Sequence, residues 1–166
     1  MNRLEKIKSK FPELKIDSFL VKNLPNIRYV SGFSGSAAAL LITKDKDHFI
    51  TDFRYKSQSA KEVYKDFDIL IYVQNSMLFL KDLIREHDLK RIGFESGFLT
   101  FNDAENLRNE FSEVEFVPID SLIEKIVICK NENEIELTKK AVDITDRTFS
   151  ELLNIIKPGM TEREVS

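Results

Sequence analysis

The sequence predicts an α/β sandwich, in which helices cover the faces of a mixed β-sheet. Short apolar stretches that are typical of strands alternate with segments whose apolar residues recur at three- and four-residue spacing, as in amphipathic helices. Residues 37–43 are an almost unbroken apolar run, which is typical of a strand covered on both faces. A polar turn separates this run from a second strand at 48–51, so the sheet contains at least one antiparallel hairpin.

The elements follow one another in a mixed order. The expected strands cover residues 16–21, 37–43, 48–51, 67–73, 91–95 and 113–117. The expected helices cover residues 4–10, 53–64, 76–87, 100–111 and 120–127, the last two capped by Thr100 and Asp120. Pro12 should end the first helix near Lys10, because proline breaks a helix interior. Residues 23–35 should form a loop with one helical turn after Pro25.

A long helix is expected near the end of the chain. Asn131 followed by Glu134 matches a capping box, and the helix would run from 131 to 156, about 39 Å. Its apolar seam consists of Ile135, Thr138, Val142, Thr145, Phe149, Leu152 and Ile156. A second capping box begins at Thr161, but a single turn does not nucleate alone. We therefore expect no helix there and interpret the chain as a fragment of a longer protein; the alternative is a frayed natural terminus.

Composition excludes several classes of protein. Lys and Arg total 25 against 28 Asp and Glu, so the formal charge is 25 − 28 = −3, which argues against a nucleic-acid partner. Nowhere does an apolar run approach the roughly 18 residues of a membrane span, so no membrane partner is expected. The single cysteine, Cys129, argues against a disulfide framework and favours a reducing, cytoplasmic compartment. Two histidines are too few for a histidine-rich metal site.

Two short motifs carry polar groups. Residues 32–36 (Gly-Phe-Ser-Gly-Ser) lack the Gly-Lys-Ser/Thr of a phosphate loop, and they precede a strand, unlike a nucleophile elbow. The alternative is a turn in which Gly32 and Gly35 supply unusual dihedral angles. Asp52 lies where a strand ends and a helix begins, so it can cap that helix, and Arg54 can act as a fork for a carboxylate.

Three carboxylates lie at or near expected strand ends. Asp52, Glu95 and Asp120 could converge to hold Mg²⁺ for phosphodiester cleavage, as in ribonuclease H-like enzymes. The alternative is that such residues cap helices. His48, on an expected strand, is interpreted as a surface or packing residue rather than a metal ligand.

Several stretches together resemble one family. Residues 26–36 (Asn-Ile-Arg-Tyr-Val-Ser-Gly-Phe-Ser-Gly-Ser), 51–55 and 92–95 resemble the N-terminal domain of the creatinase, prolidase and X-Pro aminopeptidase family. Lys130 with Glu134, the long helix and residues 158–162 resemble the opening of that family's catalytic domain. The resemblance implies a three-layer sandwich with a mixed, about six-stranded sheet and a ribonuclease H-like motif over residues 1–129. Residues 130–166 would be the linker and first helix of a truncated "pita-bread" catalytic domain.

The resemblance also implies an activity for the complete enzyme. The family holds two divalent metal ions (Mn²⁺, Co²⁺ or Zn²⁺) with two Asp, one His and two Glu, and a metal-bridging hydroxide attacks the bond before proline. These ligands would lie beyond Ser166, so this chain would contain no catalytic residue, metal site or cofactor and would be inactive alone. Its partners would be its own catalytic domain, a second subunit in a homodimer, and short proline-containing peptides.

The family's N-terminal domain helps to form dimers and to wall the active site. The resemblance assigns substrate-entrance or partner-subunit contacts to Phe33, Ser34, Ser36, Asp52, Arg54 and Tyr55. Creatine is not the implied substrate, because creatinase carries an arginine in the loop where this chain has Ser34 and Ser36. Aminopeptidase and dipeptidase action both stay open, and so does a protein-binding module of the same fold without peptidase activity. The strand-end-carboxylate nuclease is a third hypothesis.

Overall fold

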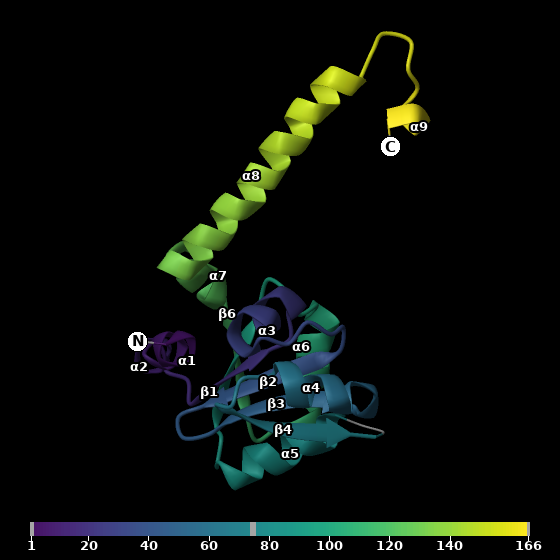
Figure 1. The fold of residues 1–166 in the computed structure, drawn as a ribbon. Helices are drawn as coiled ribbons and strands as arrows, with labels where there is room; N and C mark the ends of the chain where they lie inside the picture. Colours follow the sequence, from purple (N-terminus) through teal and green to yellow (C-terminus); the bar gives the residue numbers. More distant parts are fainter. Residues whose placement is uncertain (1, 74–75, 166) are drawn as a thin grey trace. The chain divides into compact units, whose positions relative to one another are not determined.

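The structure is a computed structural model that describes residues 2–73 and 76–165, without the side chains of residues 76 and 77. The chain divides into two compact units, the first ending at Val127 and the second beginning at Ile128. The first unit is the predicted α/β sandwich, with helices on both faces of one six-stranded sheet (Figure 1). That the second unit opens a catalytic domain at residue 130 stays a prediction.

The sheet is mixed, as expected. Its strands are β1 (Ser18–Val21), β2 (Ala38–Thr43), β3 (Asp47–Asp52), β4 (Phe67–Tyr72), β5 (Arg91–Glu95) and β6 (Glu115–Ile119). They lie in the order β4-β3-β2-β1-β5-β6. The pairs β1–β2 and β2–β3 are antiparallel, whereas β3–β4, β1–β5 and β5–β6 are parallel. The predicted hairpin is confirmed as β2–β3. The parallel pairing of β3 and β4 places the carboxyl ends of these two strands side by side.

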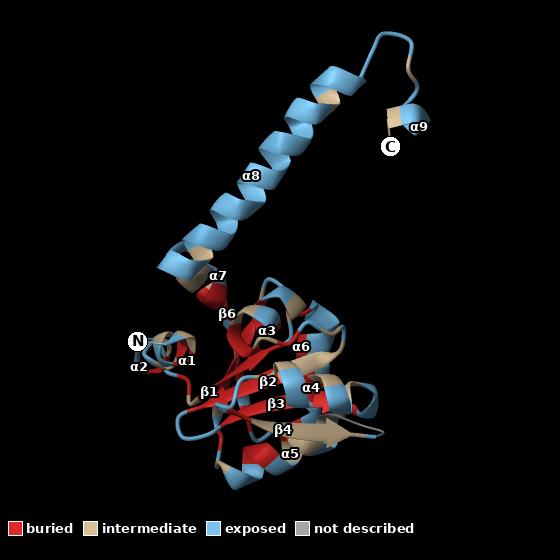
Figure 2. Ribbon diagram, in the orientation of Figure 1, coloured by how far each residue is buried: buried red, intermediate tan, exposed pale blue. Residues whose placement is uncertain are grey.

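Two hydrophobic cores share this sheet. On one face, apolar residues of the sheet pack against α1 (Arg3–Lys8), α2 (Phe11–Leu14), α3 (Leu24–Ser31) and α7 (Leu122–Ile128). On the other face they pack against α5 (Ser76–Glu86) and α6 (Phe101–Glu110). Leu40, Leu41 and Ile42 point alternately to the two faces and are all fully buried, which confirms a β2 covered on both sides. Figure 2 shows the buried residues concentrated in the sheet.

The segment after β1 is more helical than predicted. Instead of one turn, residues 24–31 form the eight-residue helix α3, with Pro25 in its first turn. Proline is tolerated there because the first amides of a helix have no intrahelical partner. Ile27 and Val30, three residues apart, are buried and fix α3 on the sheet. Pro12 likewise lies in the first turn of α2, while α1 ends earlier than predicted, at Lys8.

Two other helices begin differently from the prediction. The helix expected from residue 53 starts as a 3₁₀ turn, η1 (Phe53–Tyr55), and continues as α4 (Lys56–Glu62). The first α-helical hydrogen bond of α7 runs from the Lys125 amide to the Ser121 carbonyl (3.1 Å), so Ser121 and not Asp120 occupies the cap position.

The second unit contains the long predicted helix, α8 (Glu132–Ile155), and a short one, α9 (Glu162–Val165). The capping box is confirmed: the Glu134 amide donates to Asn131 Oδ1 and the Asn131 amide to Glu134 Oε2, both at 2.9 Å. No residue of α8 is buried. The expectation that no helix forms after Thr161 is wrong, because Thr161 donates from its amide and hydroxyl to Glu164 and closes one turn.

Within the described residues, no helix is both long enough and apolar enough to cross a membrane.

A chain shortened to residues 1–129 should fold and melt cooperatively. The buried apolar side chains found in the described residues all lie between Leu4 and Ile123, so this truncation removes none of them. We expect a single thermal transition by circular dichroism, within a few degrees of that of the 166-residue chain. A shortened chain without a cooperative transition would show that the first unit depends on residues after 129.

Candidate functional site

The six residues assigned by resemblance come together, where α3 leads into a loop and β3 leads into η1. We call Phe33, Ser34, Ser36, Asp52, Arg54 and Tyr55 the entrance cluster. Helix α3 ends at Gly32, whose φ of +85° turns the chain into this loop, as predicted for a glycine. A Cβ at Gly32 would also lie 2.8 Å from the Glu62 carbonyl oxygen, so the turn is packed tightly against the end of α4.

An aromatic stack forms the base of the cluster. The buried ring of Phe33 contacts Phe49 and Tyr55 edge-on, at centroid distances of 4.9 and 5.4 Å. A Cβ on Gly35 would lie 2.3 Å from Phe33 Cζ and 2.8 Å from Tyr55 Cε1. Gly35 is therefore required for space, and the predicted unusual dihedral is wrong at this position, because its φ is not positive.

Hydrogen bonds fix the loop above this stack. Ser36 Oγ and the Tyr55 hydroxyl are 2.6 Å apart, and this hydrogen bond lowers the pKa of Tyr55. Ser34 donates from its amide and its hydroxyl to Glu62 Oε2, at 2.8 and 2.9 Å, which lowers the pKa of Glu62. Gln58 donates to Ser34 Oγ and to Glu62 Oε1. The sequence reasoning missed Gln58 and Glu62, because a polar pair four residues apart looks like any exposed helix face.

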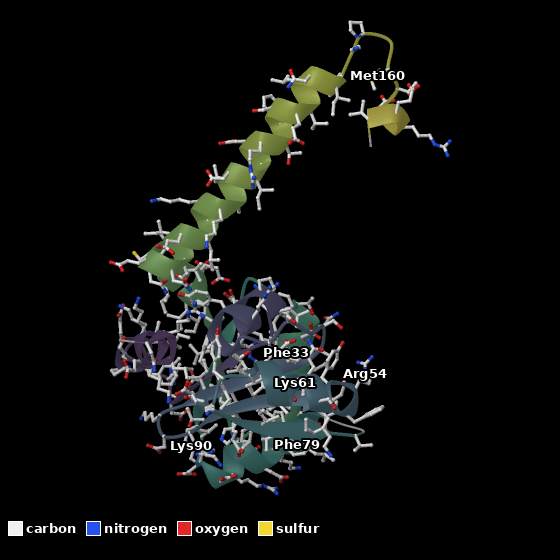
Figure 3. All side chains as sticks on the ribbon, in the orientation of Figure 1. Phe33, Arg54, Lys61, Phe79, Lys90 and Met160 are labelled. Carbon is white, nitrogen blue, oxygen red and sulfur yellow. The ribbon has the colours of Figure 1, made fainter. Side chains whose placement is uncertain are left out.

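Asp52 and Arg54 form the charged part of the cluster. Asp52 caps η1 by accepting from the Arg54 amide at 3.0 Å, which confirms the predicted cap. The Arg54 fork is engaged with this same carboxylate: Nε lies 2.9 Å from Oδ1 and Nη2 lies 2.8 Å from Oδ2. The guanidinium lowers the pKa of Asp52, and the carboxylate raises that of Arg54. The Asp52 side chain is 9% exposed and that of Arg54 62%, so the guanidinium is the part of the pair that faces solvent. Figure 3 shows Arg54 at the outer edge of the unit.

A shallow cleft opens beside the cluster. It has a volume of about 510 Å³ and is lined by Leu24, Pro25 and Arg28 of α3 together with residues 33–36. Its walls are mainly apolar, with serine hydroxyls and one guanidinium as polar groups. This arrangement is suited to contacting a peptide or a protein surface.

The nuclease hypothesis requires the three carboxylates to converge, and this prediction is wrong. Asp52 ends β3 and Glu95 ends β5, and two strands, β2 and β1, separate these in the sheet. The Asp52 carboxylate accepts hydrogen bonds from the Arg54 guanidinium, and the Asp120 carboxylate accepts one from the Ser121 hydroxyl. Among residues 2–73 and 76–165, no three His, Cys, Asp or Glu side chains gather in a way that could hold a metal ion.

Glu95 has a structural role instead. Its buried carboxylate accepts from the amides of Lys22 and Asn23, at 2.7 and 2.8 Å, and from Asn26 Nδ2 at 2.7 Å. The same Asn26 nitrogen also donates to Glu124 Oε1 at 2.7 Å, so its two hydrogens bridge two carboxylates. Burial raises the pKa of Glu95, and the N–H donors oppose that rise.

Comparison with known proteins settles the family. A family model described as Creatinase/Prolidase N-terminal domain matches residues 3–126. The chain belongs to this family. The resemblance stated from the motifs is thereby confirmed, and so is the mixed six-stranded sheet.

The relatives of this N-terminal domain are peptidases by name. "Uncharacterized peptidase YqhT" of Bacillus subtilis (strain 168) is 35% identical over 164 residues, which are 99% of this chain and 46% of that protein. The Xaa-Pro dipeptidase from Bacillus anthracis superposes with a TM-score of 0.92 at 33% identity. The X-Pro aminopeptidase from Thermotoga maritima MSB8 superposes with a TM-score of 0.83 at 29% identity. Each alignment covers 99% of this chain and 46% of the solved chain, so this chain spans about half the length of these relatives.

The substitution Gly35→Ala should destabilise the first unit by about 1–3 kcal/mol, because the added methyl group overlaps the rings of Phe33 and Tyr55. Urea unfolding measures the loss. Gly97→Ala is the matched control, since no heavy atom lies within 4 Å of a Cβ at that position. Equal stabilities of the two variants would mean that the aromatic stack does not constrain the loop.

Proposed function

We propose that this chain is the non-catalytic N-terminal part of a dinuclear metallopeptidase that hydrolyses the peptide bond before or next to proline. One observation carries the proposal: solved chains that match 99% of this one are named as an X-Pro dipeptidase and an X-Pro aminopeptidase, and each is about twice as long. Residues 1–129 would be the N-terminal domain, and residues 130–166 the linker and first helix of the catalytic domain. Such an enzyme would act in the cytoplasm.

In this proposal the chemistry lies outside the chain. Two divalent ions, Mn²⁺, Co²⁺ or Zn²⁺, would be held by two Asp, one His and two Glu of the catalytic domain. The described residues bring together no comparable group of ligands. The 166-residue chain would therefore contribute walls and contacts, and it would be inactive alone.

The entrance cluster would form part of the wall that short peptides pass, facing either its own active site or that of a second subunit in a homodimer. Asp52 holds two nitrogens of the Arg54 guanidinium, so the cation is oriented before any ligand arrives. A peptide carboxylate, or an acidic group of the second subunit, can then bind the exposed side of Arg54. The rigid loop at 33–36 and its cleft would limit the size of what passes.

The apolar seam of α8 is exposed, which supports the proposal that another part of the complete enzyme packs against it. Val142 and Phe149, two members of the predicted seam, are 51% and 62% exposed, and Ile135 is 42% exposed. A largely apolar seam of this kind, interrupted by Thr138 and Thr145, is an association surface when it is left in water. We infer that the remainder of the catalytic domain covers it in the complete enzyme.

The proposal is tested in a longer protein that continues past Ser166. There, Arg54→Gln should raise KM for an X-Pro peptide about fivefold to tenfold and change kcat less than twofold, because a contact to the peptide worth about 1 kcal/mol is lost equally from the bound and reacting states. Arg108→Gln is the matched control, since Arg108 is also exposed and also pairs with a carboxylate, that of Glu105 at 2.8 Å.

The 166-residue chain is the second control, and it should neither hydrolyse the peptide nor bind Mn²⁺, Co²⁺ or Zn²⁺ below micromolar concentration in calorimetry. An unchanged KM in the Arg54 variant would show that Arg54 makes no contact with the peptide. A continuation without the two Asp, one His and two Glu would overturn the peptidase assignment and favour a protein-binding module of the same fold.

A further inference from the structure

The two histidines of the chain, 39 residues apart in sequence, meet in the structure. His48 Nε2 and His87 Nε2 are 2.8 Å apart, a hydrogen-bond distance, and the ring centroids are 5.0 Å apart. His48 lies on β3 and is 1% exposed, while His87 follows the last residue of α5 and is half-buried. The contact therefore joins the carboxyl end of α5 to the sheet.

The groups around His48 indicate which ring nitrogen donates and which accepts in this hydrogen bond. A hydrogen bond between two imidazole nitrogens needs one N–H and one lone pair. His48 Nδ1 is buried without a hydrogen-bond partner among the described residues, and Asp68 Oδ2 is 3.8 Å from it. An N–H facing a carboxylate is more favourable than a lone pair facing it. This assignment puts the proton of His48 on Nδ1, so that its Nε2 accepts from the Nε2–H of His87.

The charged groups around His48 come from three elements. Lys46, in the turn before β3, forms an ion pair with Asp68 of β4 at 2.8 Å, and Glu86 belongs to α5. Burial, His87 and Lys46 lower the pKa of His48, while Asp68 and Glu86 raise it less. The pKa of His48 therefore lies below the usual value of 6.5.

We propose that His48 and His87 form a proton-operated latch that holds the end of α5 on the sheet near neutral pH and opens on acidification. Protonation of His48 while His87 also carries two protons leaves an N–H on both facing Nε2 atoms, so neither nitrogen can accept. The hydrogen bond is then lost, and a positive charge is left in a buried site beside a second imidazolium. The closed latch requires that one of the two facing Nε2 atoms keep its lone pair.

The direction of the pH effect follows from proton binding. Because the folded pKa of His48 is below 6.5, the unfolded chain takes up a proton first as the pH falls. The contribution of the latch to stability is therefore complete above pH 6.5 and is lost as the pH falls from 6.5 through the folded pKa. Over that interval a one-proton difference raises the unfolding equilibrium constant by up to about tenfold per pH unit.

Imidazole ¹⁵N NMR of the 166-residue chain tests the assignment directly, because two histidines give only four ring nitrogens. At pH 7.5 we expect one ring protonated at Nδ1, that of His48, and the other protonated at Nε2, that of His87. Two rings that titrate independently near pH 6.5, each as a mixture of tautomers, would overturn the proposal.

Unfolding measurements test the linkage. His87→Gln keeps a side chain able to accept from a protonated His48, so the change of the unfolding constant between pH 7.5 and 5.5 should shrink by at least threefold relative to wild type. Arg85→Gln, on the exposed surface of α5, is the matched control and should keep the wild-type pH dependence. The same pH dependence in wild type and His87→Gln would contradict the latch, whatever the absolute stability of the variant.

Discussion

Glu95 places a buried carboxylate at the carboxyl end of β5, where it accepts hydrogen bonds from two backbone amides and one side-chain amide of the neighbouring segment. The amides of Lys22 and Asn23 lie just before α3, and the Glu95 carboxylate satisfies both of them at the partly buried start of this helix. Asn26, in the first turn of α3, extends the same network to Glu124 of α7. One carboxylate thus connects β5, the end of β1, α3 and α7.

The entrance cluster depends on this connection through α3. Its amino end is held by Glu95, and about 12 Å farther on its carboxyl end opens at Gly32 into the loop that carries Phe33, Ser34 and Ser36. The second half of the cluster is fixed separately, because Asp52 ends β3 and caps the turn that presents Arg54 and Tyr55. The two halves meet through the Phe33 and Tyr55 rings and through the hydrogen bond between the Ser36 and Tyr55 hydroxyl groups. A surface held this way by ring packing and hydrogen bonds is suited to the wall that we propose it forms in the complete enzyme.

The sequence predicted best what depends on local pattern. The apolar run of β2 and the capping box at Asn131 are local, and both are found where they were expected. The helix after Pro25 is longer than the single turn expected there. Pro12, expected only to end the first helix, lies in the first turn of α2, because proline breaks a helix interior but is favourable in a first turn. The entrance residues were reached through the family resemblance, since no spacing rule brings residues 33–36 to residues 52–55.

Contacts between distant residues could not be predicted. Glu62 meets Ser34 across 28 residues, and His48 meets His87 across 39. For Glu95 the sequence leaves both a metal-ligand role and a capping role open, because a strand-end carboxylate looks the same whether it holds a cation or caps amides. Only the position of its neighbours distinguishes these roles: three N–H donors surround it, and no group of three or more His, Cys, Asp or Glu side chains that could hold a metal ion is found among the described residues.

The most direct test of this account is the stability of Glu95→Gln, measured by urea unfolding together with amide hydrogen exchange in α3 and in the loop at 33–36. The neutral amide replaces an acceptor oxygen by an N–H donor, which then faces another donor. We expect a loss of about 2 kcal/mol or more, with faster exchange in both segments, while Glu110→Gln, an exposed control on α6, changes neither. A Glu95→Gln protein with wild-type stability and unchanged exchange would contradict the claim that this carboxylate positions α3 and the loop that follows it.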